Sequence, residues 1–459
     1  MSSSDASEHA ASVQEGDVNQ SARRRAFVES RHEARTDALV EEDAELFLHQ
    51  SLSTPCLDAL SGCDGIYLET ISGRRLMDFH GNSAHQVGYG NPRVVEAIQK
   101  QLAELPFCPR RFTNRYAVEL ARKLTSLAPG DLNKVLFAPG GATAIGIALK
   151  LARLATGRHK TLSMWGSFHG ASLEAASVGG EGLFRDGLGP LLPGTEHVAP
   201  AFPYRCAYGC GGACDLRCAN YLESVLASDR EIGAVIAEPV RCTIVAAPPP
   251  GYWQRVREAC DRHGVLLVFD EIPTCLGRTG TMFACEAVGV TPDILVIGKG
   301  LGGGIVPVAA VLARADLDVA GDRAIGHYTH EKSPIGCAAA LATIECIEAD
   351  GLLEHARELG IHAMRRLGEM KLRHPLIGDV RGMGLLIGVE LVRDHATRLP
   401  ANDEAEAVMY EAMGRGLSFK VSGGNVLTLT PPLVISREQM DQALDILDAS
   451  LAAVGNGAR

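Results

Sequence analysis

The sequence has no apolar run of membrane-spanning length that is free of Lys and Arg, which argues against a transmembrane helix. Its first twenty residues, MSSSDASEHAASVQEGDVNQ, lack the charged start and apolar stretch of a secretion signal. Positive charge is also scarce, because the formal net charge is −11. This charge argues against nucleic acid or an anionic membrane as a partner, but a local arginine cluster could still bind a small anion. We therefore expect a cytoplasmic protein.

The chain is too long for one simple core, so its 459 residues predict at least two lobes. Short apolar runs of strand length, at 232–240, 265–272 and 294–300, alternate with helical segments such as 251–264. This alternation predicts an α/β fold, with a parallel sheet covered on both faces. The last part of the chain has long helices around short strands instead, which indicates a smaller α+β lobe.

This change in the pattern of helices and strands divides the chain into three predicted regions. Residues 1–75 are expected to form an N-terminal segment that joins the small domain, with a disordered start, a helix over about 26–50 and a hairpin. Residues 76–335 are the predicted large domain, and residues 336–459 are the predicted small domain.

Most of the thirteen cysteines stand singly in apolar segments, as reduced core thiols do. The stretch CAYGCGGACDLRC differs, because it places four cysteines at four-residue intervals: Cys206, Cys210, Cys214 and Cys218. Four thiolates could hold zinc, although structural zinc sites usually have two-residue gaps. A Gly-rich surface insertion with free or paired thiols is the alternative.

One lysine stands in the apolar stretch ILVIGKGLGGGIVPVAAV, at Lys299. A buried charged amine costs several kcal/mol unless it is paired, neutralised or consumed chemically. Asp270 closes an earlier strand, and the carboxyl ends of parallel strands meet at one rim, so the two side chains should face one cleft. A lysine can form a Schiff base, and a carboxylate can keep a pyridinium nitrogen protonated. An enzyme that uses pyridoxal phosphate requires both groups. A structural Asp–Lys ion pair is the alternative.

A third feature favours the cofactor over the ion pair. LFAPGGATAIGIALKLAR reads as a strand, a glycine turn and a helix, whose start offers free N–H groups and a positive dipole end to a phosphate. The predicted phosphate cup consists of Gly140, Gly141, Ala142 and Thr143.

At these residues, and in GSFHGAS, AEPV, FDEIPTCLGRTG, GKGLGGG and GHYTHEKSP, the sequence resembles the class III aminotransferases, which are pyridoxal phosphate enzymes of fold type I. The resemblance covers roughly 60–450 and implies a large domain with a mostly parallel seven-stranded sheet. It makes Lys299 the Schiff-base lysine and places Asp270 on the ring nitrogen. It also implies cofactor contacts from Phe168, His169, Glu238 and Ile272, and from Thr329 to the neighbouring subunit's cofactor. A homodimer, or a dimer of dimers, with sites at the interface follows from that last contact.

The chain departs from this family at Thr428 in NVLTLTPPL, where many members have an arginine. Threonine cannot form the bidentate pair that a carboxylate favours, which argues against glutamate or pyruvate as a routine partner. Arginine occurs instead at Arg110 and Arg111, in a region that lines the family's substrate entrance, and at Arg241, where glutamine is more usual. These three are candidate ligands for a phosphonate or carboxylate; surface pairing is the alternative for the first two.

Four further segments, EGDVNQS, HQSLSTPCLD, SMWGSFHGASLEAASVGGE and FKVSGGNVLTLTPPL, resemble one subgroup of the family. Its members are ammonia-lyases of bacterial phosphonate degradation that act on (R)-1-hydroxy-2-aminoethylphosphonate. The resemblance implies a lyase that forms phosphonoacetaldehyde, with Lys299 as general base. The alternatives are an ω-amine aminotransferase that uses 2-aminoethylphosphonate, a diamine or an ornithine-type donor with a keto acid, a phospho-lyase, and a non-catalytic binding protein.

Overall fold

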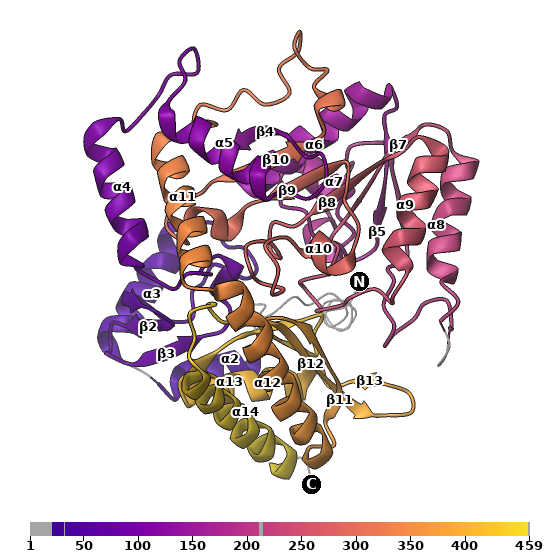
Figure 1. Ribbon diagram of the computed structural model, residues 1–459. Coiled ribbons are helices and arrows are strands. Elements are labelled where there is room, and N and C mark those ends of the chain that lie inside the picture. The colour runs from indigo at the N-terminus through magenta and orange to yellow at the C-terminus, as the bar shows by residue number, and fades with distance from the viewer. Residues whose placement is uncertain (1–20, 32, 211–213, 458–459) are drawn as a thin grey trace.

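The computed structural model describes residues 21–31, 33–210 and 214–457, which form two lobes (Figure 1). The first twenty positions of the predicted disordered start lie outside these residues. The large lobe contains a seven-stranded sheet, which confirms the predicted architecture. Its order is β4 (Lys134–Ala138), β10 (Ala309–Ala313), β9 (Ile294–Ile297), β8 (Leu266–Asp270), β7 (Ile232–Ala237), β5 (Lys160–Met164) and β6 (Thr195–Val198). Only β10 runs antiparallel to its neighbours in this sheet.

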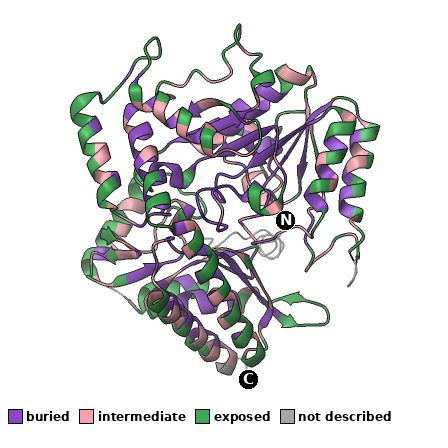
Figure 2. Cartoon of the chain, in the orientation of Figure 1, coloured by how far each residue is buried: buried purple, intermediate pink, exposed green. Residues whose placement is uncertain are grey.

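The central strands of this sheet are apolar throughout because both of their faces are covered. Every residue of β7, β8 and β9 is buried. Alternate residues belong to two separate cores: one packs against α6 (Gly141–Thr156), and the other includes residues of α9 (Tyr252–His263). Trp253 of α9 packs edge-on against Phe269 of β8 at a centroid distance of 4.7 Å. Figure 2 shows the sheet buried and the outer helix faces exposed.

Three helices flank the large lobe on one side: α4 (Pro92–Glu104), α5 (Arg115–Leu127) and α11 (Pro334–Ala349). The boundary predicted at residue 336 falls within α11. Helix α11 packs against α4 and α5 (Figure 1), and the division of the chain at residue 336 stays a prediction.

The small lobe combines residues from both parts of the chain. The predicted hairpin is formed by β2 (Tyr67–Thr70) and β3 (Arg75–Asp78), and β1 (Leu60–Asp64) pairs with β2. Strand β14 (Leu417–Ser418), from the other end of the sequence, pairs in parallel with β3. The predicted helix over 26–50 is two helices, α2 (Ala22–Glu29) and α3 (Ala34–Leu46), and Phe27 of α2 packs on Tyr410 at 4.9 Å.

The second sheet of the small lobe provides the wall that faces the large lobe's strand ends. Its order is β11 (Ile377–Met383), β12 (Leu386–Asp394), β16 (Val426–Leu429) and β15 (Lys420–Ser422), and β13 (Leu399–Pro400) pairs with β12. The helices that accompany it are α12 (Leu352–Arg373), α13 (Asn402–Gly414) and α14 (Arg437–Gly457).

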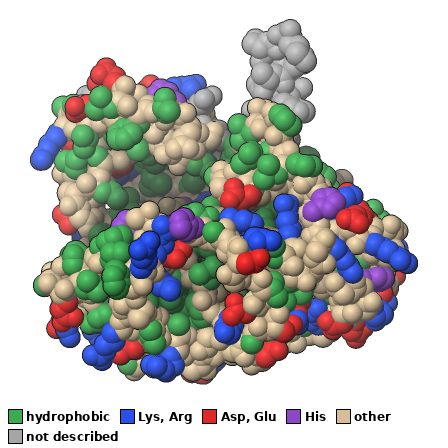
Figure 3. Space-filling model, turned by 90° about the horizontal axis from the view of Figure 1, so that it is seen from above, with side chains coloured by type: hydrophobic (Ala, Val, Ile, Leu, Met, Phe, Trp, Pro, Cys, Tyr) green, Lys and Arg blue, Asp and Glu red, His purple; other side chains and the backbone are tan. Residues whose placement is uncertain are grey.

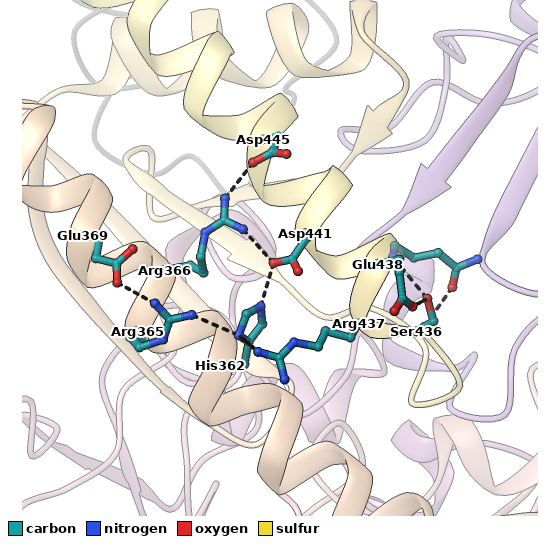
Figure 4. Close-up of polar contacts among 10 residues, drawn as sticks. His362, Arg365, Arg366, Glu369, Ser436, Arg437, Glu438, Asp441 and Asp445 are labelled. Atoms are coloured by element: carbon teal, nitrogen blue, oxygen red, sulfur yellow. Dashed lines mark hydrogen bonds and ion pairs between the residues drawn. The ribbon is translucent and has the colours of Figure 1, made fainter.

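A polar network joins α12 to α14 on the outside of the small lobe (Figure 4). Asp441 of α14 accepts from His362 Nε2 at 2.6 Å and from Arg366 at 2.7 Å, and Arg366 also donates to Asp445 at 2.6 Å. Because His362 and Arg366 of α12 both donate to one carboxylate of α14, the network links the two helices.

Charged side chains of both signs are interspersed over the face seen in Figure 3. In the part of the chain that the structure describes, no helix has the length and apolar character needed to cross a membrane.

Candidate active site

A cavity of about 1130 Å³ lies between the two lobes. The large lobe contributes residues that follow β4, β5, β7, β8 and β9, which is the carboxyl edge of its parallel strands. The small lobe contributes β14, β15 and β16, and the N-terminal segment closes a further side. Nine of the predicted site residues line it: Gly140, Gly141, Ala142, Phe168, His169, Glu238, Asp270, Ile272 and Lys299.

Lys299 follows β9 after a single glycine and has a left-handed backbone with φ of +46°. Such a conformation costs a non-glycine residue about 1–3 kcal/mol and is typical of functional sites. The neighbours Ile297 and Gly300 are buried, whereas the Lys299 side chain is exposed within the cavity. The expected burial cost is therefore avoided, because the amine leaves the apolar strand environment.

Asp270 pairs with a histidine. His169 Nδ1 lies 2.8 Å from Asp270 Oδ2, and Asp270 Oδ1 accepts from the backbone N–H of Ile272 at 3.0 Å. Both the Asp270 and His169 side chains are buried. A carboxylate held by two donors keeps a fixed orientation, so His169 positions Asp270 as well as lining the cavity.

The start of α6 fits a phosphate group. Gly140, at the N-cap, provides no side-chain cap, so the first N–H groups of the helix face the cavity beside the positive dipole end. A Cβ on Gly140 would meet nothing within 4 Å, whereas one on Gly141 would lie 2.9 Å from Ile272 Cδ1. Thr143 does not line the cavity, because its hydroxyl donates to the Gly140 carbonyl at 2.7 Å. The predicted phosphate cup is therefore formed by backbone N–H groups.

Apolar side chains provide two walls for a flat ring. Phe168 and Ile272 both line the cavity, and Phe168 packs on Phe184 at a centroid distance of 4.4 Å. Glu238 accepts from the backbone N–H of Phe168 at 3.5 Å and of Cys242 at 3.0 Å, so it holds these two segments together. The amine, the oriented carboxylate, the anion cup and the apolar walls together fit pyridoxal phosphate.

The structure places the three candidate arginines outside the cavity lining. Arg110 and Arg111 are exposed, as their surface alternative predicts. Arg241 is buried, and its guanidinium donates to the carbonyl of Trp165 at 3.3 Å and to that of Gly166. These bonds link Arg241 to the loop just before Phe168, and a contact of Arg241 with the substrate stays a prediction.

Thr329 is exposed and also lies outside the cavity lining of its own chain. A contact with a neighbouring subunit's cofactor requires such an outward position, and it stays a prediction.

The four-cysteine hypothesis receives no support as a zinc site. Cys210 Sγ donates to Asp215 Oδ1 at 3.3 Å, and all thirteen cysteines have free thiols. The described residues, which omit 211–213, hold no group of three His, Cys, Asp or Glu side chains placed to bind a metal ion.

Residues of the small-lobe wall and of the segment after β3 were missed by sequence reasoning. Lys420, Ser422 and His80 line the cavity, beside Thr428, which the sequence had marked only as the position that lacks an arginine. Burial lowers the pKa of Lys420 to about 7 and also lowers the pKa of His80. A lone lysine between Phe419 and Val421 is a signal of the same kind as the one that marked Lys299.

Comparison with known proteins gives matches over most of the chain. The model of the aminotransferase class III family matches residues 52–451. An (R)-1-hydroxy-2-aminoethylphosphonate ammonia-lyase of Vibrio splendidus is 50% identical over 96% of this chain and 95% of its own length. A leucine/methionine racemase of Thermococcus litoralis is 38% identical over 84% of this chain and 89% of its own. The solved structure of an amine transaminase from an uncultivated Pseudomonas species, in its PLP-bound form, has a TM-score of 0.82 with 33% identity, covering 89% of this chain and 99% of that one.

Proposed function

The chain belongs to the aminotransferase class III family, and we propose that it is a pyridoxal phosphate-dependent ammonia-lyase. Its proposed substrate is (R)-1-hydroxy-2-aminoethylphosphonate, which it would convert to phosphonoacetaldehyde and ammonia. The similarity to the Vibrio splendidus lyase supports this proposal, since it extends over nearly the whole of both chains.

The observation that carries the proposal is the hydroxyl-lined wall at Thr428. The Thr428 hydroxyl lies 3.1 Å from Ser422 Oγ and 3.3 Å from the Thr243 carbonyl oxygen. A transaminase must bind a keto acid, and a planar carboxylate is best bound by the two parallel N–H groups of an arginine. The cavity offers no such arginine at this strand position, which favours a reaction that needs one substrate.

The residues have separate roles in this reaction. Pyridoxal phosphate, when bound, would withdraw electrons from the carbon that carries the substrate amine and make its C–H acidic. Gly140, Gly141 and Ala142 would bind its phosphate, and Asp270 would keep its ring nitrogen protonated. His169 would hold the Asp270 carboxylate through the 2.8 Å contact.

Lys299 Nζ would carry the cofactor at rest and become free when the substrate amine takes its place. The free amine would then remove the proton from the amine-bearing carbon. The hydroxyl of the neighbouring carbon would leave as water, with the proton returned by Lys299. The released product is an enamine, whose imine tautomer adds water to give the aldehyde and ammonia, so no keto acid is consumed.

We also propose that the chain acts as a homodimer in the cytoplasm, with a dimer of dimers as the alternative assembly. Three consecutive apolar side chains, Leu46, Phe47 and Leu48, are 73%, 62% and 92% exposed, and Phe112 is 65% exposed. Apolar groups exposed to this extent favour burial against another chain.

The decisive experiment is incubation with (R)-1-hydroxy-2-aminoethylphosphonate in the absence of any keto acid. We expect stoichiometric ammonia and phosphonoacetaldehyde over many turnovers. An aminotransferase would stop after one turnover until a keto acid is added, and a phospho-lyase would release inorganic phosphate. Either result would refute the ammonia-lyase.

A further inference from the structure

Two adjacent strands of the small lobe present a cation and two hydroxyls to the cavity. Lys420 of β15 lies directly opposite Thr428 of β16 in the antiparallel register. Opposite residues project to the same face of a sheet, and Ser422, two residues further along β15, projects there too. The 3.1 Å contact between Thr428 Oγ1 and Ser422 Oγ places these two hydroxyls side by side, and all three residues line the cavity.

The other basic side chains that line the cavity lie outside the wall formed by β15 and β16. Among the described residues, the Lys and Arg side chains that line the cavity are Arg24, Lys299 and Lys420. Lys299 has its role at the cofactor, and Arg24 Nη2 donates to the carbonyl of Pro55 at 2.8 Å in the N-terminal segment. Lys420 is the cation that stands beside Thr428, where many relatives of this family have an arginine.

We propose that Lys420, together with the hydroxyls of Ser422 and Thr428, binds the phosphonate group of the substrate. This inference rests on the proposed function. The geometry of the donors is its basis: an arginine fork matches the two coplanar oxygens of a carboxylate, whereas a phosphonate directs three oxygens in different directions. A compact ammonium with three donors, flanked by two hydroxyls, matches that tetrahedral arrangement. The pair Lys420 and Thr428 would therefore select a phosphonate over a carboxylate.

The electrostatics of the wall support this assignment. Burial lowers the pKa of Lys420 to about 7, so part of the amine is neutral near pH 7 in the free protein. A dianion bound next to it favours the charged form, so the cation is strongest when the phosphonate is present.

The test uses the protein loaded with pyridoxal phosphate, so that the cup of α6 is filled, and methylphosphonate as the probe. Its dissociation constant is measured by calorimetry for the natural chain and for Lys420→Met. We expect binding to weaken about ten- to hundredfold in Lys420→Met, as for the loss of one charge-assisted contact. Lys420→Arg should weaken it less than Lys420→Met does. Lys100→Met, at an exposed lysine of α4, is the matched control and should leave binding unchanged.

A second variant guards against a Lys420→Met chain that fails to fold or to hold the cofactor. Thr428→Val keeps the shape of the side chain and removes its hydroxyl, and it should weaken methylphosphonate binding about threefold to tenfold. KM for the phosphonate substrate should rise in both variants with a smaller change in kcat. Unchanged binding in both variants, or a loss in Arg24→Met with none in Lys420→Met, would overturn the assignment.

The inference and the proposed function fail in different ways. If the natural chain releases ammonia from the substrate but Lys420→Met binds methylphosphonate normally, only the assignment of Lys420 is refuted. If no ammonia is released but Lys420→Met still loses methylphosphonate, the phosphonate site stands and the lyase reaction is refuted.

Discussion

Arg241 could either contact the substrate or hold the loop before Phe168, and replacing it with methionine tests which of these roles it has. Arg241 is 8% exposed, and its guanidinium donates to the carbonyls of Trp165 and Gly166, in the loop just before Phe168. Methionine keeps much of the volume but leaves both carbonyls without this donor, at about 1–3 kcal/mol each. Relief from burying a charge offsets part of this loss, so we expect a net destabilisation of the loop of about 2 kcal/mol.

The loop conformation that Arg241 stabilises is the one that presents Phe168 to the cavity. If the 2 kcal/mol penalty falls on that conformation, the Kd for pyridoxal phosphate rises about 30-fold. KM for the substrate, measured at saturating cofactor, should change by less than about twofold. Equilibrium dialysis gives the first quantity and steady-state kinetics the second. Arg122→Met, at an exposed arginine of α5, is the control that should leave both values unchanged.

A tenfold or larger rise in KM with an unchanged cofactor Kd would refute this reasoning. It would show that the Arg241 guanidinium leaves the Trp165 and Gly166 carbonyls and contacts substrate, as the sequence alone suggests.

Two other variants test parts of the site, and a third tests the buried carboxyl of Glu181, which interacts electrostatically with Arg241 and Glu238. Lys299→Ala should lower ammonia release at least about a hundredfold, and borohydride should no longer add the cofactor's mass to the chain; normal turnover would remove Lys299 from its role. Asp270→Ala leaves His169 without its 2.8 Å partner and should weaken cofactor binding and abolish turnover, whereas a fully active variant would place the ring-nitrogen contact elsewhere. Burial raises the pKa of Glu181 from 4.5 to about 7, so its neutral form favours folding below pH 4.5 and this contribution is lost as the pH rises towards 7. The free energy of unfolding of Glu181→Gln, measured in urea, should therefore rise above that of the natural chain between pH 5 and pH 8, by at most about 3 kcal/mol. If the free energy of unfolding of the two chains depended on pH in the same way, the raised pKa of Glu181 would be contradicted.

Local patterns predicted the large lobe well because its elements are specified by their own residues. The buried runs of β7, β8 and β9 read as strands covered on both faces. In the small lobe, the hairpin of β2 and β3 was also predicted from the sequence. The helix over 26–50 was predicted as one element because its charge pattern continues across the break between α2 and α3.

The sequence pointed to Asp270 and Lys299 because their residue types suit one chemistry, and both line the cavity, while their roles stay predictions. The hydrogen-bond partners of Arg241 could not be predicted, because the Trp165 and Gly166 carbonyls lie about 75 residues away along the chain. Lys420 was missed for a similar reason: its place opposite Thr428 depends on strand register, and its place on the cavity wall depends on how the lobes pack.

The parallel pairing of β3 with β14 has a consequence for synthesis of the chain. During translation the first strands of the small lobe emerge early, but their partner leaves the ribosome only after more than three hundred further residues. The large lobe can therefore fold while its neighbour is still incomplete. A nascent chain stalled before residue 417 would leave the edge of β3 that pairs with β14 without its partner strand.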